Sequence, residues 1–378
     1  MPRIRVLQTS DLHLRPDCPE RLATLDQIFA TATAHAADMV IVAGDLFDRS
    51  SDAIALRQEV RKRIEAIAPL PVVLLPGNHD QAAFGPETDY GTNAVVLRET
   101  PWQKTTVCGL DVVGVPYQTG RTLAECLVGT TMDPHHTILV GHGSLMSGVG
   151  DAFVGEGEEG AWMPIFLADI LGRCCYGALG HVHSGRNLVH RDGERLVGYA
   201  GSPLTTSRRE LGRRGVLLVD FEAAAGVVAH EFVPLPTPYY ERVEVVCVPG
   251  MEKKAVRELA RLAAELRGPG AQVLACLSGI VTENEDKLHQ AATRALEIAF
   301  ADPRGEDVAG AEMGEDTLKS RPIFTLEARS FRHLANVPVV AEFVERVQLQ
   351  IEDGRESDPE VIQSALRLGL GAFLEALR

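Results

Sequence analysis

The sequence predicts an α/β protein whose first part is built on parallel strands. Two observations support this prediction. The sequence contains short apolar runs, and the first runs are separated by segments at 21–35 and about 52–66 in which apolar residues recur with helical spacing. Unbroken runs, unlike alternating ones, are typical of strands buried on both faces of a sheet. The runs are Met39–Ala43, Pro71–Leu75, Thr137–Val140 and Tyr176–Leu179. At 378 residues the chain is long enough for two or three domains.

Composition narrows the class of protein. The net charge is −15, which is unusual for a general binder of nucleic-acid backbone, so any DNA contact must be local. The seven cysteines form no C-x-x-C pair, which favours reduced structural thiols. Because no apolar stretch is long enough to span a membrane and Met1 leads almost directly into a strand, we expect a cytoplasmic, nucleoid-associated protein without membrane contact.

Each of five predicted strands ends in a cluster of acidic, amide or imidazole side chains. Asp45 follows the run Met39–Ala43 and Gly44. It therefore lies at the carboxyl end of a strand, where ligands bind in an open α/β sheet. Taken alone, Asp45 could equally be the N-cap of the helix that follows. The other clusters are Asp11 and His13 after Ile4–Gln8, Asn78, His79 and Asp80 after Pro71–Leu75, His142 after Thr137–Val140, and His181 and His183 after Tyr176–Leu179. One such cluster is unremarkable, whereas five at strand ends predict a site.

The residue types predict a metal centre. Oxygen and imidazole ligands without thiolate suit manganese, iron or zinc, and the aspartates favour manganese. The candidate ligands are Asp11, His13, Asp45, Asn78, His142, His181 and His183. Seven ligands are too many for one ion, but they fit two ions bridged by a carboxylate, the arrangement that clamps a phosphoryl group during in-line displacement.

The order D-x-H, G-D-x-x-D, G-N-H-D, G-H, G-H-x-H resembles the calcineurin-type metallophosphoesterases. The resemblance implies a four-layer β-sandwich flanked by helices, with Asp45 bridging two divalent ions. It assigns the first ion to Asp11, His13, Asp45 and His183, and the second to Asp45, Asn78, His142 and His181. It further implies that His79 is catalytic, that Asp80 orients His79, and that Asp48 supports a metal ligand.

Within that superfamily the chain is most similar to SbcD-type DNA double-strand-break repair nucleases. The segments that carry this similarity are Gly44–Asp48, Tyr176–His183 and Tyr199–Pro203. It implies a manganese-dependent exonuclease and endonuclease acting on DNA ends, paired with an SbcC-type ABC ATPase, and a capping domain that bears on substrate choice. The alternatives are a phosphodiesterase for small substrates such as cyclic nucleotides, which the acidic charge favours, and a non-enzymatic scaffold of the same fold.

Three prolines in Pro234–Pro238 predict a stiff linker, so we expect a catalytic domain over 1–235. Alternating strands and helices then predict a small α/β capping domain over 236–335, for which dimerisation into a homodimer or simple packing is the alternative role. Two helices over 336–378 complete the chain, and the apolar last one, Pro359–Leu377, either docks the ATPase or packs on the capping domain.

The expected DNA contacts follow the last ligand histidines. They are Ser202, Arg208, Arg209, Arg213 and Arg214. A solvated basic loop is the alternative. The glycine-rich acidic segment 147–160 is expected to be a mobile loop beside His142, and 301–321 a long polar loop.

Overall fold

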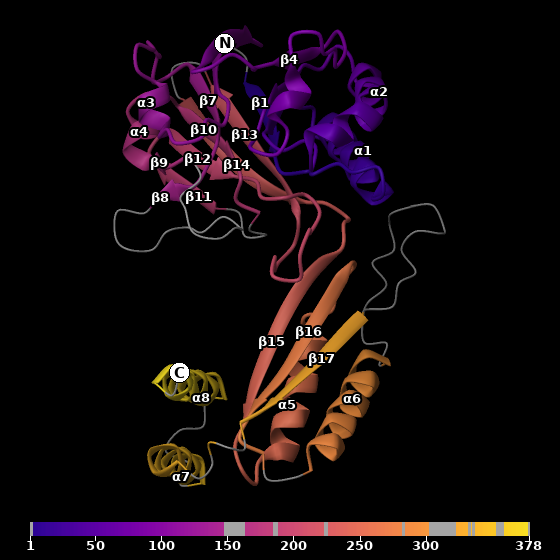
Figure 1. The fold of residues 1–378 in the computed structure, drawn as a ribbon, viewed down its shortest axis with the longest axis vertical. Helices are drawn as coiled ribbons and strands as arrows, with labels where there is room; N and C mark the ends of the chain where they lie inside the picture. Colours follow the sequence, from indigo (N-terminus) through magenta and orange to yellow (C-terminus); the bar gives the residue numbers. More distant parts are fainter. Residues whose placement is uncertain are drawn as a thin grey trace. The chain divides into compact units, whose positions relative to one another are not determined.

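The computed structural model describes residues 3–146, 163–183, 188–222, 226–281, 284–301, 323–331, 334, 337–352 and 359–376. The segments 147–160 and 302–321, for which loops are expected, lie outside these residues. The chain forms two compact units, Met1–Tyr239 and Tyr240–Arg378, each with its own hydrophobic core (Figure 1). The first unit ends four residues beyond the expected domain boundary at 235.

Two six-stranded sheets form the centre of the first unit. The first sheet runs in the order β14 (Gly226–Pro234), β13 (Gly215–Glu222), β1 (Ile4–Thr9), β2 (Met39–Ala43), β3 (Val72–Leu75) and β4 (Ala94–Val96). Strands β1 to β4 are parallel, whereas β13 and β14 form an antiparallel hairpin beside β1. The carboxyl ends of β1 to β4 therefore meet at one edge.

The second sheet also contains four parallel strands. Its order is β11 (Leu188–Asp192), β12 (Arg195–Tyr199), β10 (Tyr176–Gly180), β7 (Thr137–His142), β6 (Leu110–Val115) and β5 (Gln103–Val107). The four central strands are parallel, and the edge strands β11 and β5 are antiparallel to their neighbours. This sheet also has an edge at which parallel strands end together.

The first unit has four layers. Side chains between the sheets form one core, in which Ile41 of β2 and Ile138 of β7 are fully buried. The alternate residues of β2, such as Val40, pack with α1 (Pro19–Ala34) and α2 (Ser50–Ala66) on the outer face (Figure 1). The strand is buried on both faces, which explains its unbroken apolar run. The predicted four-layer α/β sandwich is confirmed.

The outer face of the second sheet is covered by shorter elements. They are α3 (Leu123–Cys126), α4 (Leu167–Leu171), β8 (Leu145–Met146) and β9 (Ile165–Phe166). A single-turn 3-10 helix, η1 (Gln81–Phe84), follows β3. Direct polar contacts also join the sheets, because the buried amide of Gln8 on β1 donates to the carbonyl oxygens of Leu179 (2.9 Å) and Gly198 (3.0 Å). The two carboxyl edges are thereby held in fixed register.

The second unit is a small α/β domain. Its sheet has the order β15 (Tyr239–Cys247), β16 (Ala271–Gly279) and β17 (Ile323–Ser330), with β16 and β17 parallel. Helices α5 (Glu252–Glu265) and α6 (Glu285–Ala301) pack with this sheet in one core. These elements alternate between strand and helix, as the sequence predicts for this part of the chain.

The C-terminal helices α7 (Pro338–Glu352) and α8 (Pro359–Ala376) belong to this second unit. Leu366 and Leu370 of α8 share a core with Val246 and Val248 of the β15 segment. The side-chain amide of Gln363 also bonds both the N–H (2.7 Å) and the carbonyl (3.3 Å) of Val246. One face of α8 is therefore committed to its own domain. Within the described residues, no helix has the length and apolar character needed to cross a membrane.

Candidate metal centre

All seven predicted ligands converge at the shared edge of the two sheets. Asp11 and His13 follow β1, Asp45 follows β2 and Asn78 follows β3, while His142 ends β7 and both His181 and His183 follow β10. The first four come from one sheet and the last three from the other. The sandwich therefore brings together side chains that are up to 172 positions apart in sequence.

Asp11, His13 and His183 form the first group of donors. Their donor atoms all lie within 4.8 Å of one another. The Nε2 atoms of His13 and His183 are 3.0 Å apart, and Nε2 of His183 is 3.6 Å from Oδ1 of Asp11. Two imidazole nitrogens and a carboxylate oxygen at these distances form a donor set that could hold one divalent cation.

Asn78, His142 and His181 form the second group. Oδ1 of Asn78 lies 2.9 Å from Nε2 of His142 and 3.3 Å from Nδ1 of His181. His142 is fully buried, His181 is nearly so, and Asn78 is half-buried. Imidazole nitrogens and an amide oxygen without thiolate suit a divalent ion of the manganese, iron or zinc type.

Asp45 lies between the two groups. Its Oδ2 is 3.2 Å from Nε2 of His142 in the second group and 3.9 Å from Nε2 of His13 in the first. The other oxygen, Oδ1, accepts a hydrogen bond from the backbone N–H of His79 (2.9 Å). One oxygen that faces both groups is what a bridging carboxylate requires, so the donor set fits two divalent ions.

The ionisation of these groups follows from their burial and their neighbours. Burial alone would raise the pKa of Asp45, but His142 and the other nearby imidazoles outweigh it and hold that pKa well below its usual range. Burial lowers the pKa of His142, yet the adjacent Asp45 outweighs it and raises that pKa to about 9. Burial and His142 together lower the pKa of His181 to about 4. The bridging oxygen is therefore anionic and His181 is a neutral donor at neutral pH.

The backbone at the site is strained. Positive φ angles occur at Asp11 (55°), His13 (47°), Asp45 (53°) and His181 (100°). Such angles cost non-glycine residues about 1–3 kcal/mol each and cluster at functional sites. Contacts across the site hold them, since the N–H groups of Asp11 and His13 donate to the carbonyls of Gly44 (3.1 Å) and Asp45 (3.0 Å).

Three glycines permit the close approach of these strand ends. A Cβ at Gly77 would lie 2.1 Å from Oδ1 of Asp45, and one at Gly44 would lie 2.0 Å from Nδ1 of His142. At Gly180 a Cβ would meet the carbonyl oxygen of Ala43 at 1.8 Å. No side chain fits at these positions, so the G-D, G-N and G-H pairs of the sequence are steric requirements of the site.

Three ligand rings are oriented by a partner on their far nitrogen. Nδ1 of His142 donates to the carbonyl of Ala43 (2.8 Å), and Nδ1 of His13 lies 3.4 Å from Oδ1 of Asp48, as expected for a supporting carboxylate. Nδ1 of His183 lies 3.1 Å from Oε1 of Glu210. The sequence reasoning missed Glu210, whose one available signal is that it is an acid within the basic run 208–214.

His79 and Asp80 are arranged differently from the prediction. The His79 side chain is exposed, with its ring centroid 4.8 Å from that of His13 and its Nδ1 2.9 Å from the carbonyl oxygen of Asp48. Asp80 is fully buried and instead accepts from the N–H groups of Gly77 (2.8 Å) and Phe47 (3.1 Å). The prediction that Asp80 orients His79 is therefore wrong, because its carboxylate shapes the loop that carries Asn78.

Two of the five expected DNA contacts are also wrong. Ser202 and Arg214 are each 1 % exposed, and both point into the network around Glu210. A phosphate cannot reach a buried guanidinium. Arg208, Arg209 and Arg213 are exposed, and Arg213 lies over the ring of Tyr239.

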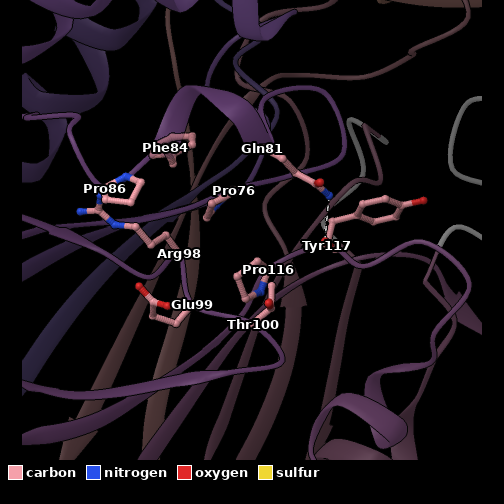
Figure 2. A pocket seen from close by; sticks show the side chains of 9 residues that line it. All are labelled: Pro76, Gln81, Phe84, Pro86, Arg98, Glu99, Thr100, Pro116 and Tyr117. Atoms are coloured by element: carbon pink, nitrogen blue, oxygen red, sulfur yellow. Dashed lines mark hydrogen bonds between the residues drawn. The ribbon is translucent and has the colours of Figure 1, made fainter.

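A cavity of roughly 260 Å³ adjoins the segment that carries Asn78 and His79 (Figure 2). Pro76 and Gln81, which flank this segment, form part of its wall, and the Gln81 amide donates to the carbonyl of Tyr117 (2.8 Å). Arg98 and Pro116 follow the carboxyl ends of β4 and β6, which neighbour β3 and β7 in their sheets. The cavity therefore lies at the same edge as the metal ligands, one strand further out.

Comparison with known proteins supports the resemblance for part of the first unit. Residues 4–161 match the family model described as calcineurin-like phosphoesterase, the family that the sequence motifs resemble. The family binds two divalent metals and consists of metal-dependent hydrolases. The match includes Asp11 to His142 and ends before His181 and His183. None of the curated proteins compared with the chain matches it significantly.

Solved structures show weaker similarity. A dimetal phosphatase from Danio rerio is 8 % identical, with 61 % of this chain and 99 % of that chain covered and a TM-score of 0.40. The phosphoesterase Yfce from E. coli is 13 % identical, with 60 % and 98 % covered and a TM-score of 0.30. The nuclease MPE from Pseudomonas putida is 20 % identical, with 39 % and 66 % covered and a TM-score of 0.25. Similarities this low assign no substrate.

Proposed function

We propose that the first unit is a manganese-dependent phosphodiesterase that hydrolyses DNA near its ends, as the nuclease subunit of a DNA repair complex. The observation that carries the two-metal part is Oδ2 of Asp45, which faces His13 on one side and His142 on the other. Asp11, His13 and His183 would hold one ion and Asn78, His142 and His181 the other, and the bound ions would supply charge that activates water and stabilises the attacking and leaving oxygens of the phosphate. Manganese is favoured by the mixture of carboxylate, amide and imidazole donors.

His79 supplies the proton chemistry in this proposal. Its Nδ1–H donates to the carbonyl of Asp48, which leaves Nε2 as the nitrogen available to substrate. When protonated, Nε2 would donate to a phosphate oxygen or to the leaving 3′-oxygen. Its ring stands perpendicular to that of His13, so it is beside the first group of ligands and accessible from solvent. General acid catalysis of this kind contributes typically about 10²–10⁴-fold.

Positive charge next to the site supports DNA as the substrate. Arg208 and Arg209 are exposed and lie between Thr206 and Glu210, which both contact Nδ1 of His183. Two exposed guanidinium groups on this segment would meet phosphates that flank the scissile one. The segments shared with SbcD-type nucleases, Gly44–Asp48 and Tyr199–Pro203, favour the same substrate.

The proposed partner is an SbcC-type ABC ATPase, which would supply the DNA affinity that a chain with net charge −15 lacks. Helix α8 buries Leu366 and Leu370 in its own domain, but Leu368 on another face is 76 % exposed. That face is the proposed contact. Leu368→Glu should weaken co-purification of the ATPase without changing Tm, whereas Glu342→Lys on α7 serves as a charged control. Unchanged capture by Leu368→Glu would refute docking through this face.

A phosphodiesterase for small substrates is the second candidate. The acidic charge favours it, because a cyclic nucleotide needs no extended basic surface, and the cavity lined by Pro76 and Gln81 offers space for a small molecule near the segment that carries Asn78. The remaining alternative, a scaffold without turnover, is disfavoured by the complete and convergent ligand set.

One assay separates the three candidates. Purified protein is incubated with Mn²⁺ or Mg²⁺ and either end-labelled linear DNA, bis-p-nitrophenyl phosphate or cyclic nucleotides, with His79→Gln as the control for contaminating nuclease. Cleavage of DNA that is lost in His79→Gln supports the proposal. Turnover of cyclic nucleotides alone supports the second candidate, and no turnover of any substrate by protein that holds two ions supports the scaffold.

A further inference from the structure

We propose that Glu210 is a positioning residue that fixes the orientation and the tautomer of His183 for metal binding. This inference deepens the proposed function, because it rests on His183 being a metal ligand. It also assigns to Glu210 and Arg214 a role different from the DNA contact proposed for their neighbours Arg208 and Arg209. The two residues would hold one ligand of the first metal group in place.

The carboxylate of Glu210 is buried and collects hydrogen-bond donors from three residues. Oε1 accepts from Nδ1–H of His183 (3.1 Å) and from the hydroxyl of Thr206. Oε2 accepts from the backbone N–H of Thr206 (2.9 Å) and from the hydroxyl of Ser202 (3.2 Å). Four donors on two oxygens leave the carboxylate little freedom, so Oε1 is a fixed point for the imidazole of His183.

Arg214 ties the same network to the backbone of His183. Its side chain is completely buried, its Nη2 lies 3.6 Å from Oε2 of Glu210, and its Nη1 donates to the carbonyl oxygen of His183. A buried ion pair is a poor device for stability, because desolvation offsets most of the attraction. Its geometric effect is clear, however: Glu210 holds the ring and Arg214 holds the main chain of one residue.

The consequence concerns Nε2 of His183. An acceptor at Nδ1 keeps the proton on that nitrogen, so Nε2 presents its lone pair toward Oδ1 of Asp11 and Nε2 of His13. His142 obtains the same effect from the backbone carbonyl of Ala43, which no substitution removes. His183 depends on a side chain, so this support can be tested by mutation.

The experiment measures metal binding directly. Apo protein is titrated with Mn²⁺, and the bound ions are counted by equilibrium dialysis with elemental analysis. Mutation of a residue that hydrogen-bonds to a metal-binding histidine typically lowers metal affinity by about 10–100-fold. Glu210→Ala should therefore lower the affinity for one of the two ions by that factor and leave the affinity for the other unchanged. Glu210→Gln keeps one acceptor oxygen, so its affinity should lie between those of Glu210→Ala and the wild type.

A double-mutant cycle excludes a merely structural role. If Glu210 acts through His183, adding Glu210→Ala to His183→Ala should cause no further loss of metal, whereas independent effects would add. Asp220→Asn is the matched control, since Asp220 is also a buried carboxylate bonded to arginines, Arg3 and Arg5, but lies away from the ligands on β13. It should leave both affinities unchanged.

The outcomes separate this inference from the proposed function. Suppose that the wild type binds two ions and His183→Ala binds one, but Glu210→Ala binds both with normal affinity. This result would overturn the role of Glu210 and leave the proposed metal site intact. Wild-type protein that binds no ions would overturn the metal site itself. If Glu210→Ala does not fold, the isosteric Glu210→Gln carries the test, and its unchanged affinity for both ions would overturn the inference.

Discussion

Replacing Gly77 with alanine is expected to damage the site through a single methyl group. The new Cβ would lie 2.1 Å from Oδ1 of Asp45 and 2.6 Å from its backbone nitrogen. The carboxylate must move by about 0.9 Å to reach the 3.0 Å that real Cβ contacts respect. The backbone at Asp45 is held in place, because the carbonyl oxygens of Gly44 and Asp45 accept from the N–H groups of Asp11 (3.1 Å) and His13 (3.0 Å). The bridging oxygen is thereby displaced from both ligand groups.

The expected magnitude follows from this displacement. A misplacement of about 1 Å at a reacting centre costs roughly 10²-fold in rate, and overpacking of this kind destabilises by about 1–3 kcal/mol. Gly77→Ala should therefore lower the rate of bis-p-nitrophenyl phosphate hydrolysis with Mn²⁺ by roughly 10²-fold. It should also lower the affinity for both metal ions, while the protein still folds.

Gly85→Ala is the matched control. It lies eight residues further along the same segment, has an ordinary backbone conformation, and its added Cβ would meet no atom within 4 Å. It should retain wild-type activity and metal content. A Gly77→Ala protein that holds two ions and turns over at the wild-type rate would refute the reasoning, because Asp45 would then tolerate displacement or would not be the bridge.

Three further predictions test the site and its surroundings. Asp45→Ala should weaken both ions and abolish turnover, whereas His183→Ala should mainly affect one, and elemental analysis of an Asp45→Ala protein that still held two ions would contradict the bridge. His79→Gln should keep both ions and lose about 10²–10⁴-fold in activity, so loss of the ions would make His79 a ligand. Burial raises the pKa of Asp220, but its hydrogen bonds to Arg5 and Arg3 outweigh this and lower it. Its stabilising effect is therefore complete above the unfolded pKa of about 3.9 and lost as pH falls through the folded pKa. Urea titrations should show Asp220→Asn less stable than wild type by about 1–3 kcal/mol at pH 7, with the difference shrinking below about pH 4.

The sequence predicts the strands that carry ligands because their signal is local. A strand buried on both faces is a continuous apolar run, and Met39–Ala43 is found at the bounds expected from that run. The sequence reasoning overlooked β5 and β6, the hairpin Gln103–Val115. Its edge strand QKTTV is partly exposed and carries Gln and Lys, so it lacks a continuous apolar run.

What the sequence could not predict depends on long-range packing. Asp80 and His79 are adjacent in sequence, which suggests a pair, but the tight turn at Gly77 brings the Asp80 carboxylate back to its own loop. Glu210 lies in a run of arginines that reads as a solvated basic surface. Only the fold shows that Arg214 and Glu210 turn inward toward His183 while Arg208 and Arg209 turn outward.

The distance between the two sheets sets the geometry of the metal centre. Each ligand group combines donors from both sheets: His183 joins Asp11 and His13, and His142 and His181 join Asn78. The groups can therefore form only if the sheets approach closely, and at Gly180 the approach is so close that a Cβ would meet the Ala43 carbonyl at 1.8 Å. Because the ions would bind donors on both sides of this contact, metal binding must also favour the packed sandwich over any state in which the sheets separate. Folding of the sandwich and metal binding are therefore thermodynamically coupled. The packing of the two sheets also holds the strained backbone of the ligands in place.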